Sequence, residues 1–302
     1  MLWIIWSPSM IIAVLTILLP IFLGMGIGYA WVRIGRPFDN STLAAIATDL
    51  ALPCLILSSL INAEISISAF ATMVLAATAS LAAIAVIGSL LLGASRLSLR
   101  TYLPSVTWGN AAFLGIPLVI FAFGQNAAGY AAAFCAVSLV FNMSLVAVIT
   151  AGRESVVSRL CHPLILAVVA GVLIRLLHVN VPHSALVSVQ LVGDMAVPLT
   201  LMLVGSSLAR LKPSALAEAF IFSVLRMGAG ASVGIVMGFA FDLPPLARSV
   251  LILQCAMPVA VLSYVVAQRW GDNPEAVAGL VVVSTWISLI CLPVMIGLMA
   301  DI

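Results

Sequence analysis

Charged side chains are what this sequence lacks most. Asp, Glu, Lys and Arg make up 7% of its 302 residues, whereas hydrophobic residues make up 64% and the mean hydropathy is +1.29. A soluble domain of this length could not cover its surface with so few charges. The net charge is only +2 and the basic residues are scattered, which argues against a nucleic-acid partner. The composition therefore predicts an integral membrane protein.

Cysteine and histidine are also scarce, and their spacing fits neither a redox pair nor a metal site. The cysteines are Cys54, Cys135, Cys161, Cys255 and Cys291. They form no CxxC pair, and all but Cys161 fall within apolar runs, which is typical of packing residues. His162, His178 and His183 are spread over two connections and offer little to a metal ion. We therefore expect no metal and no cofactor other than a coupling ion.

Two further features are not expected from the sequence: a cleavable leader and a second domain formed by a long hydrophilic insertion. The first nine residues carry no positive charge, so we expect no signal peptide, and Trp3 and Trp6 are typical of interfacial anchors. What the chain does contain is ten apolar runs of about the 20 residues that a membrane span needs. The runs are 10–32, 40–62, 68–93, 101–123, 127–150, 160–178, 184–208, 216–241, 245–268 and 274–299. The sequence thus predicts a single membrane unit of ten spans.

The basic residues predict the orientation of these spans. With the N-terminus outside, nine of the twelve Lys and Arg residues fall in inner connections, Arg175 and Arg248 fall outside, and Arg226 lies within the eighth span. The nine are Arg33, Arg36, Arg96, Arg100, Arg153, Arg159, Arg210, Lys212 and Arg269. Cytoplasmic connections carry an excess of Lys and Arg, so we predict that both termini lie outside.

Three patterns recur in the same order, five spans apart. They are D-x-A-x-P at 49–53 and 194–198, prolines 13 residues apart at 104/117 and 245/258, and G-Q-N or G-D-N at 124–126 and 271–273. Together they indicate a duplication into residues 1–150 and 151–302. Because five is odd, the second copy must be inverted relative to the first. Inverted repeats with paired broken helices are the signature of secondary transporters.

The fourth and ninth spans carry the predicted breaks, and these define the candidate binding site. Gly109, Gly115 and Pro117 interrupt the fourth span, and Pro258 interrupts the ninth. Half-helices that begin near the two prolines would aim free N–H groups at the membrane centre, where they suit a carboxylate. Asn110 and Gln254 could add neutral donors and acceptors. The alternative is that the prolines only kink packed helices.

Three charged residues within spans are candidates for coupling or charge pairing. Asp49 and Asp194 should face the bundle interior or water, where burial would let either one carry a proton, or each could bond backbone freed by the proline four residues later. Arg226 could neutralise Asp194, snorkel to the inner surface or contact an anionic substrate. Among polar residues of the fifth and tenth spans, we select only Asn142 as a substrate-site candidate.

Several motifs resemble the auxin efflux carrier family, which comprises plant PIN transporters and bacterial carriers for malate, malonate or other small carboxylates. The motifs are G-N-x-x-x-L-G-I-P at 109–117, P-L-x-L-x-x-x-G-x-S-L at 198–208, Q-x-A-M-P at 254–258, A-Q-R at 267–269 and N-P at 273–274.

The resemblance implies an all-α fold of ten transmembrane helices in two inverted five-helix repeats, with spans four and nine crossing at their prolines. It implies an elevator-like movement of spans 3–5 and 8–10 against a scaffold of spans 1, 2, 6 and 7, in a bacterial cytoplasmic membrane. It makes Asn110, Pro117 and Pro258 substrate-region positions and places Asp49 and Asp194 on the scaffold side. The connection at 151–160 is much shorter than the cytosolic insertion of plant members.

The leading hypothesis is therefore a carrier of a small organic anion, with no enzymatic activity. A ligand sensor on a transporter fold and an intramembrane aspartyl protease are the alternatives. The protease would need Asp49 and Asp194 close together, whereas inverted repeats place them at different depths. Coupling to H⁺, coupling to Na⁺ and uniport all stay open, and a homodimer through the scaffold would be a reasonable assembly.

Overall fold

The computed structural model describes residues 8–62, 66–149, 162–211, 216–270 and 273–299. Interpretations that concern Trp3, Trp6, Arg153, Arg159, Cys161, Lys212, Gly271 and Asp272 fall outside these ranges. Within them the chain is helical, and its only extended pairing is a single bridge between Gly109 and Val259. The prediction of an all-α fold is confirmed for this part of the chain.

Most helices coincide with the predicted apolar runs, and several runs consist of two or more helical pieces. The first half contains α1 (Pro8–Arg33), α2 (Asn40–Ile46), η2 (Ala47–Ala51), α3 (Leu52–Asn62), α4 (Ile67–Ala94), α5 (Leu99–Thr107), η3 (Ala111–Gly115), α6 (Ile116–Phe123), η4 (Gln125–Ala127) and α7 (Ala128–Ile149). The second half contains α9 (Pro163–Leu176), α10 (His183–Gly193), α11 (Ala196–Arg210), α12 (Leu216–Ala240), α13 (Pro245–Cys255), α14 (Val261–Trp270) and α15 (Pro274–Met299).

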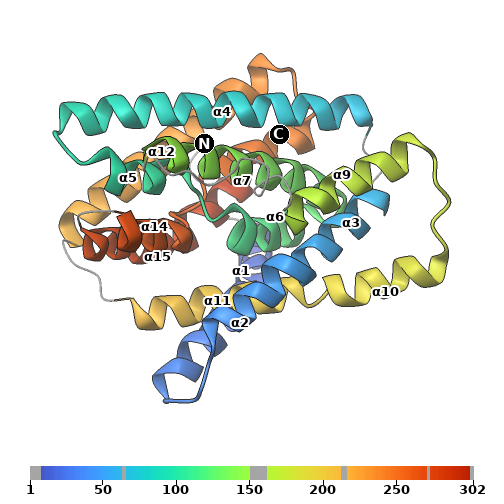
Figure 1. Ribbon diagram of the computed structural model, residues 1–302, viewed down its shortest axis with the longest axis horizontal. Coiled ribbons are helices and arrows are strands. Elements are labelled where there is room, and N and C mark those ends of the chain that lie inside the picture. Colours follow the sequence, from blue (N-terminus) through green and yellow to red (C-terminus); the bar gives the residue numbers. More distant parts are fainter. Residues whose placement is uncertain (1–7, 63–65, 150–161, 212–215, 271–272, 300–302) are drawn as a thin grey trace.

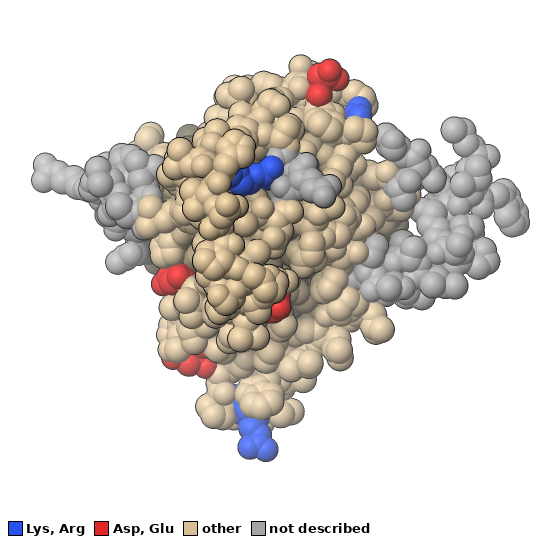
Figure 2. All heavy atoms as spheres, turned by 90° about the vertical axis from the view of Figure 1, so that its right-hand side faces the viewer, with Lys and Arg blue, Asp and Glu red and all other residues tan. Residues whose placement is uncertain are grey.

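Six helical stretches of the described chain are long and apolar enough to cross a membrane. They are Asn40–Asn62, Ile67–Ala94, Gln125–Val146, His183–Arg210, Leu216–Ala240 and Pro274–Met299. Figure 1 shows α4 and the α10–α11 pair along opposite edges of the molecule, with α5, α6, α7 and α14 between them. In Figure 2, charged side chains form separate spots on a largely uncharged face. This multi-helix, apolar exterior is that of a membrane-embedded protein.

Close helix packing depends on glycines whose position a larger residue could not take. A methyl group on Gly28 of α1 would lie 2.0 Å from the carbonyl oxygen of Met202 on α11, and one on Gly205 of α11 would lie 1.9 Å from that of Met25. Small residues let membrane helices approach in this way. The same device joins α12 to α13, because a methyl group on Gly230 would lie 2.1 Å from the Cys255 carbonyl oxygen.

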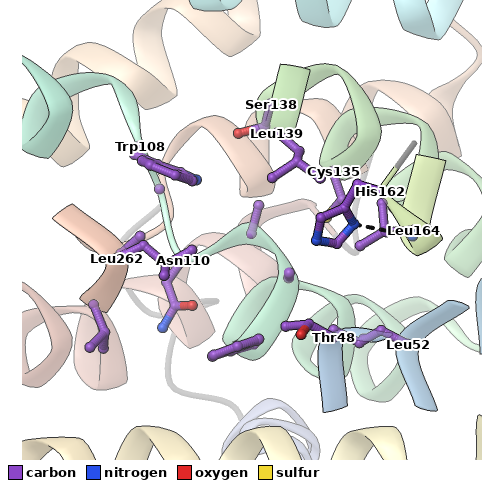
Figure 3. A pocket seen from close by; sticks show the side chains of 16 residues that line it. Thr48, Leu52, Trp108, Asn110, Cys135, Ser138, Leu139, His162, Leu164 and Leu262 are labelled. Atoms are coloured by element: carbon purple, nitrogen blue, oxygen red, sulfur yellow. Dashed lines mark hydrogen bonds between the residues drawn. The ribbon is translucent and has the colours of Figure 1, made fainter. Parts of the chain in front are cut away.

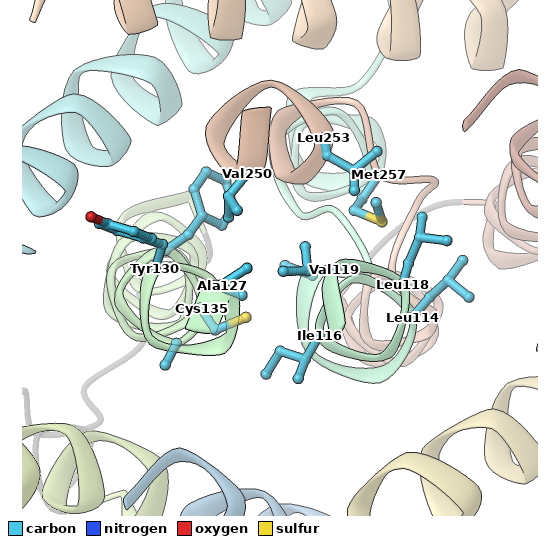
Figure 4. Close-up of a cluster of buried hydrophobic side chains, with 14 of the residues drawn as sticks. Leu114, Ile116, Leu118, Val119, Ala127, Tyr130, Cys135, Val250, Leu253 and Met257 are labelled. Carbon is cyan, nitrogen blue, oxygen red and sulfur yellow. The ribbon is translucent and has the colours of Figure 1, made fainter. Parts of the chain in front are cut away.

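The apolar core surrounds the two interrupted helices. Figure 4 shows Val119 of α6 facing the side chains of Ala127 of η4 and Cys135 of α7, and these residues belong to one buried cluster together with Leu114, Ile116 and residues of α13. Cys135 and Cys255 are buried in this cluster as free thiols, as expected of packing residues. The breaks of the two interrupted helices are thus held inside the protein and away from lipid.

Candidate functional site

The two interruptions meet and pair with each other. Residues Trp108 to Asn110 separate α5 from η3, and residues Ala256 to Ala260 separate α13 from α14. The Asn110 N–H donates to the Pro258 carbonyl at 2.7 Å, and the Ala260 N–H donates to the Trp108 carbonyl at 2.9 Å. Each break therefore satisfies backbone groups that the other leaves without helical partners, as a membrane interior requires.

Side chains of neighbouring helices fix the paired breaks. The Val259 N–H donates to Ser284 Oγ on α15 at 3.0 Å, and the Ser263 hydroxyl of α14 donates to the Pro104 carbonyl of α5 at 3.2 Å. Both serines are fully buried. The crossing is therefore a defined structure held by hydrogen bonds, which is more than a pair of proline kinks.

The half-helix of the fourth run begins earlier than the sequence predicted. We expected its start near Pro117, but it begins with a π-helical turn at Ala111, in which the Gly115 N–H donates to the Asn110 carbonyl at 2.9 Å and the Ile116 N–H donates to the Ala111 carbonyl. Pro117 then occupies the second position of α6. Because the hydrogen bonds of the π-helical turn span five residues, the helix continues through Pro117 although proline has no N–H to donate. The proline therefore does not break the helix itself. The partner half-helix, α14, begins at Val261, three residues after Pro258.

Both half-helices begin at the wall of one cavity, whose volume is about 90 Å³ (Figure 3). The wall includes Gly109 to Phe113 from the first break and Ala260 to Leu262 from the second. The first amide groups of a helix have no intrahelical acceptor, and they carry the positive end of the helix dipole. Two such ends at one cavity favour an anion.

Asn110 is the predicted site residue that lines this cavity. Its side chain is buried, and its Nδ2 atom has no hydrogen-bond partner among the described residues. A buried amide without a partner is unfavourable by about 1–3 kcal/mol, so the group is available to bind a ligand.

The sequence analysis missed His162, which lines the cavity opposite Asn110, as does Thr48 of η2 (Figure 3). Nδ1 of His162 accepts the Leu164 N–H at 3.2 Å and caps α9. A neutral imidazole that accepts through Nδ1 carries its proton on Nε2, which makes that atom a donor. The spacing of the histidines bears only on metal binding, whereas the His-Pro pair at the start of an apolar run is the sequence signal for a helix cap.

Arg226 and Gln254 lie beside the crossing and do not line the cavity. Arg226 is 8% exposed, and a methyl group on Gly109 would lie 2.8 Å from its Nη2 atom. The Gln254 amide lies against Gly115, where a methyl group would be 2.4 Å from Oε1, and neither of its polar atoms has a partner within the described ranges. Of the roles considered for Arg226, pairing with Asp194 is not seen: no salt bridge joins them in the described structure, and Arg226 Nε and Nη1 have no hydrogen-bond partner there.

Asn142 occupies a buried hydrogen-bond network next to the first break. Its Oδ1 accepts the Thr107 hydroxyl at 2.7 Å, and its Nδ2 donates to the Ser138 carbonyl at 2.9 Å. Ser138 also lines the cavity, whereas Asn142 is fully buried behind it. Thr107 is the last residue of α5, so the network ties the end of that helix to α7.

The two aspartates are exposed and lie apart from the crossing cavity. Asp49 belongs to the π-helical turn η2, and its Oδ1 accepts the Thr48 hydroxyl at 3.0 Å. Asp194 lies between α10 and α11 and borders a separate cavity of about 80 Å³, together with polar side chains of α3 and η4. The structure therefore brings together Asn110, Gly115, Pro117, Gln254, Pro258 and Arg226 at or beside the crossing, and it leaves Asp49 and Asp194 outside.

Comparison with known proteins gives the family. A search of curated proteins found no match. A family model described as membrane transport protein matches residues 13–159 and 153–296, which together are almost the whole chain. The chain therefore belongs to this family of membrane transporters, the family of the auxin efflux carriers.

Proposed function

We propose that this protein is a carrier that moves a small organic anion across the cytoplasmic membrane of a bacterium. The observation that carries the proposal is the convergence of two half-helix N-termini and the unpaired amide of Asn110 on one cavity. Positive helix ends at the centre of a broken-helix transporter bind carboxylate groups in the same manner. The partner we propose is therefore a carboxylate.

The walls of the cavity narrow the substrate class. Apart from Asn110, Thr48, Ser138 and His162, its lining is apolar and includes Trp108. Pockets of this kind bind through apolar contacts, and a few polar groups fix the orientation. We propose a monocarboxylate with a small apolar body, whose carboxylate lies at the helix ends and whose body lies against Trp108.

We propose that the carrier works by alternating access. We propose ten spans in two inverted repeats, which divide near residue 150 and leave both termini outside. This topology would place Thr48 and His162 near the cytoplasmic ends of their spans. Because both residues border the cavity, this orientation supports access from the cytoplasm. Spans 3–5 and 8–10, which contain both half-helices, would then move as an elevator against spans 1, 2, 6 and 7.

Binding is tested first, on purified protein in detergent. Isothermal titration with butyrate, benzoate and malonate should give binding of the monocarboxylates and weaker binding of malonate. Asn110→Ala should abolish binding, because the cavity wall then has no side-chain amide among the described residues. The proposal fails if the wild-type protein binds none of the three acids.

Transport is tested next in proteoliposomes. Labelled benzenesulfonate is a suitable probe because a sulfonate stays ionised and crosses lipid slowly, so that background leak is small. We expect exchange of the labelled probe across the bilayer, absent with Asn110→Ala. Binding of benzenesulfonate without its exchange would indicate a sensor. Repeating the exchange with imposed pH, sodium and potential gradients identifies the coupling ion, if one is used.

A further inference from the structure

We infer that Arg226 is the fixed counter-charge of the crossing cavity, and that the site therefore selects ligands with a single negative charge. The inference rests on the proposed function and deepens it, because it assigns the charge of the substrate and the residue that determines it.

Arg226 is a buried cation whose described surroundings supply no anion. It is 8% exposed, its Nε and Nη1 atoms have no hydrogen-bond partner among the described residues, and no carboxylate pairs with it there. An arginine keeps its proton under all ordinary conditions. A charge buried in a membrane protein without a partner is strongly unfavourable, and such residues mark ligand pathways. A bound anion would provide the missing counter-charge.

The far side of Arg226 offers no such partner. There it borders a cavity of about 280 Å³ between α4 and α12. The described residues that line this cavity are mainly aliphatic, with Phe222 and Ser95, and none of them is acidic. The nearest carboxylate of its own helix, Glu218, is exposed two turns earlier. The charge is therefore not neutralised from the lipid side.

The packing of α12 directs Arg226 toward the crossing. Arg226, Gly230, Gly234 and Gly238 follow one another at intervals of four and so share one face of the helix. The glycines bring this face against the backbone of α13, since a methyl group on Gly234 would lie 2.8 Å from the Ile252 Cα atom. Arg226 thus lies one helical turn before Gly230, the first of these contacts, and beside the end of α13.

Gly109 lies between the guanidinium and the cavity. Its backbone forms part of the cavity wall, whereas the position of a β-carbon on Gly109 lies 2.8 Å from Arg226 Nη2. The positive charge therefore acts on the cavity through a single glycine backbone. In this partly dehydrated interior, Coulomb attraction over such a short path changes affinity by roughly 10- to 100-fold.

Charge balance then determines selectivity. A monoanion neutralises Arg226. A neutral isostere leaves the buried charge of Arg226 uncompensated. A dianion places its second negative charge against the apolar part of the cavity wall, which is unfavourable. The helix ends and Asn110 orient the carboxylate, whereas Arg226 discriminates by net charge.

The experiment measures three ligands of similar shape on the whole purified protein: benzoate, benzamide and phthalate. Wild-type protein should bind benzoate roughly 10- to 100-fold more tightly than benzamide, and more tightly than phthalate. Arg226→Gln should lower benzoate affinity by that factor and leave benzamide affinity nearly unchanged, so that the preference for charge is lost. Arg226→Lys is the matched control that keeps the charge, and it should keep most of the preference.

Gly109→Ala provides a second variant that retains the arginine. Its methyl group would displace Nη2 from its position behind Gly109 and move the charge away from the cavity, so benzoate affinity should fall more than benzamide affinity. An unchanged benzoate-to-benzamide ratio in Arg226→Gln overturns the inference and leaves the proposed function intact. If Arg226→Gln does not fold, an unchanged ratio in Gly109→Ala overturns the inference instead. Wild-type protein that binds none of the three ligands overturns the proposed function together with the inference.

Discussion

Removing the Ser284 hydroxyl should destabilise the crossing far more than removing a similar hydroxyl one turn away. Ser284 is fully buried on α15, and its Oγ accepts the Val259 N–H at 3.0 Å while it donates to the Val281 carbonyl at 3.3 Å. Ser284→Ala therefore leaves the N–H of a buried residue without an acceptor, in the middle of the paired breaks. An unsatisfied buried donor is unfavourable by about 1–3 kcal/mol.

Ser288 is the matched control on the same helix. It is 1% exposed, and its hydroxyl donates at 2.7 Å to the Thr285 carbonyl of its own helix. Ser288→Ala removes the same atoms but orphans no donor, so its effect should stay below about 1 kcal/mol. The difference between the two substitutions, about 1–2 kcal/mol, isolates the hydrogen bond to the crossing.

The assay is equilibrium unfolding in mixed micelles, with the free energy of unfolding compared among the wild-type protein and the two variants. Ligand binding by isothermal titration gives a second measurement, since Val259 pairs with Gly109 at the cavity wall. We expect Ser284→Ala to weaken benzoate binding and Ser288→Ala to leave it unchanged. Equal free energies of unfolding for the two variants would refute the role assigned to this hydrogen bond.

Three further predictions test other parts of the structure. Gly205→Ala would place a methyl group 1.9 Å from a carbonyl oxygen of α1, so it should lower the free energy of unfolding by about 1–3 kcal/mol. Gly26→Ala is the control: its methyl group would meet nothing within 4 Å, so the substitution should be neutral or stabilising. Asn110→Ala should abolish anion binding and leave stability unchanged, because the Asn110 Nδ2 has no partner among the described residues. Asn142→Ala should lower the free energy of unfolding in micelles, because it removes the hydrogen bonds to Thr107 and Ser138. Hydrogen bonds from the Thr42 and Ser41 hydroxyls and from the Ser41 N–H lower the pKa of Asp39 from 3.8 to about 2. The ionised Asp39 should therefore stabilise the fold fully above pH 3.8, and this stabilisation should be lost as the pH falls through about 2. A thermal-stability difference between wild type and Asp39→Ala that grows on acidification would contradict that assignment.

The sequence alone predicted the parts of the fold that depend on local chemistry. Apolar runs, the two prolines and the adjacent glycines located both interruptions, because these residues act on the backbone of their own segment. The π-helical turn at 111–115 was not predicted, and this moved the start of the half-helix by six residues. Whether a helix breaks at a proline or widens before it depends on the packing around it. Pro53 follows the π-helical turn η2 in the same way.

The composition of the site was harder to predict, since it depends on which side chains the tertiary fold brings together. Asn110 was identified because it is adjacent to a break, whereas His162 lies some 50 residues further along and reaches the cavity only through the packing of α9. For Arg226 the sequence left three roles open: pairing with Asp194, snorkelling and contact with an anionic substrate. In the structure the Nη2 atom of Arg226 lies close to Gly109. This contact is possible because glycine has no side chain, and no pattern in the sequence predicts it.

The paired breaks explain why one interruption requires the other. An extended segment inside a membrane exposes N–H and C=O groups that neither lipid nor its own helix can satisfy. Here Asn110 and Ala260 donate across the crossing to Pro258 and Trp108, and a proline is suited to its position because only its carbonyl is needed. The first amides of the two half-helices are not used in this exchange and stay directed at the cavity. Any ligand that binds them thus touches both halves of the chain at once, and its binding free energy is linked to the stability of the crossing itself.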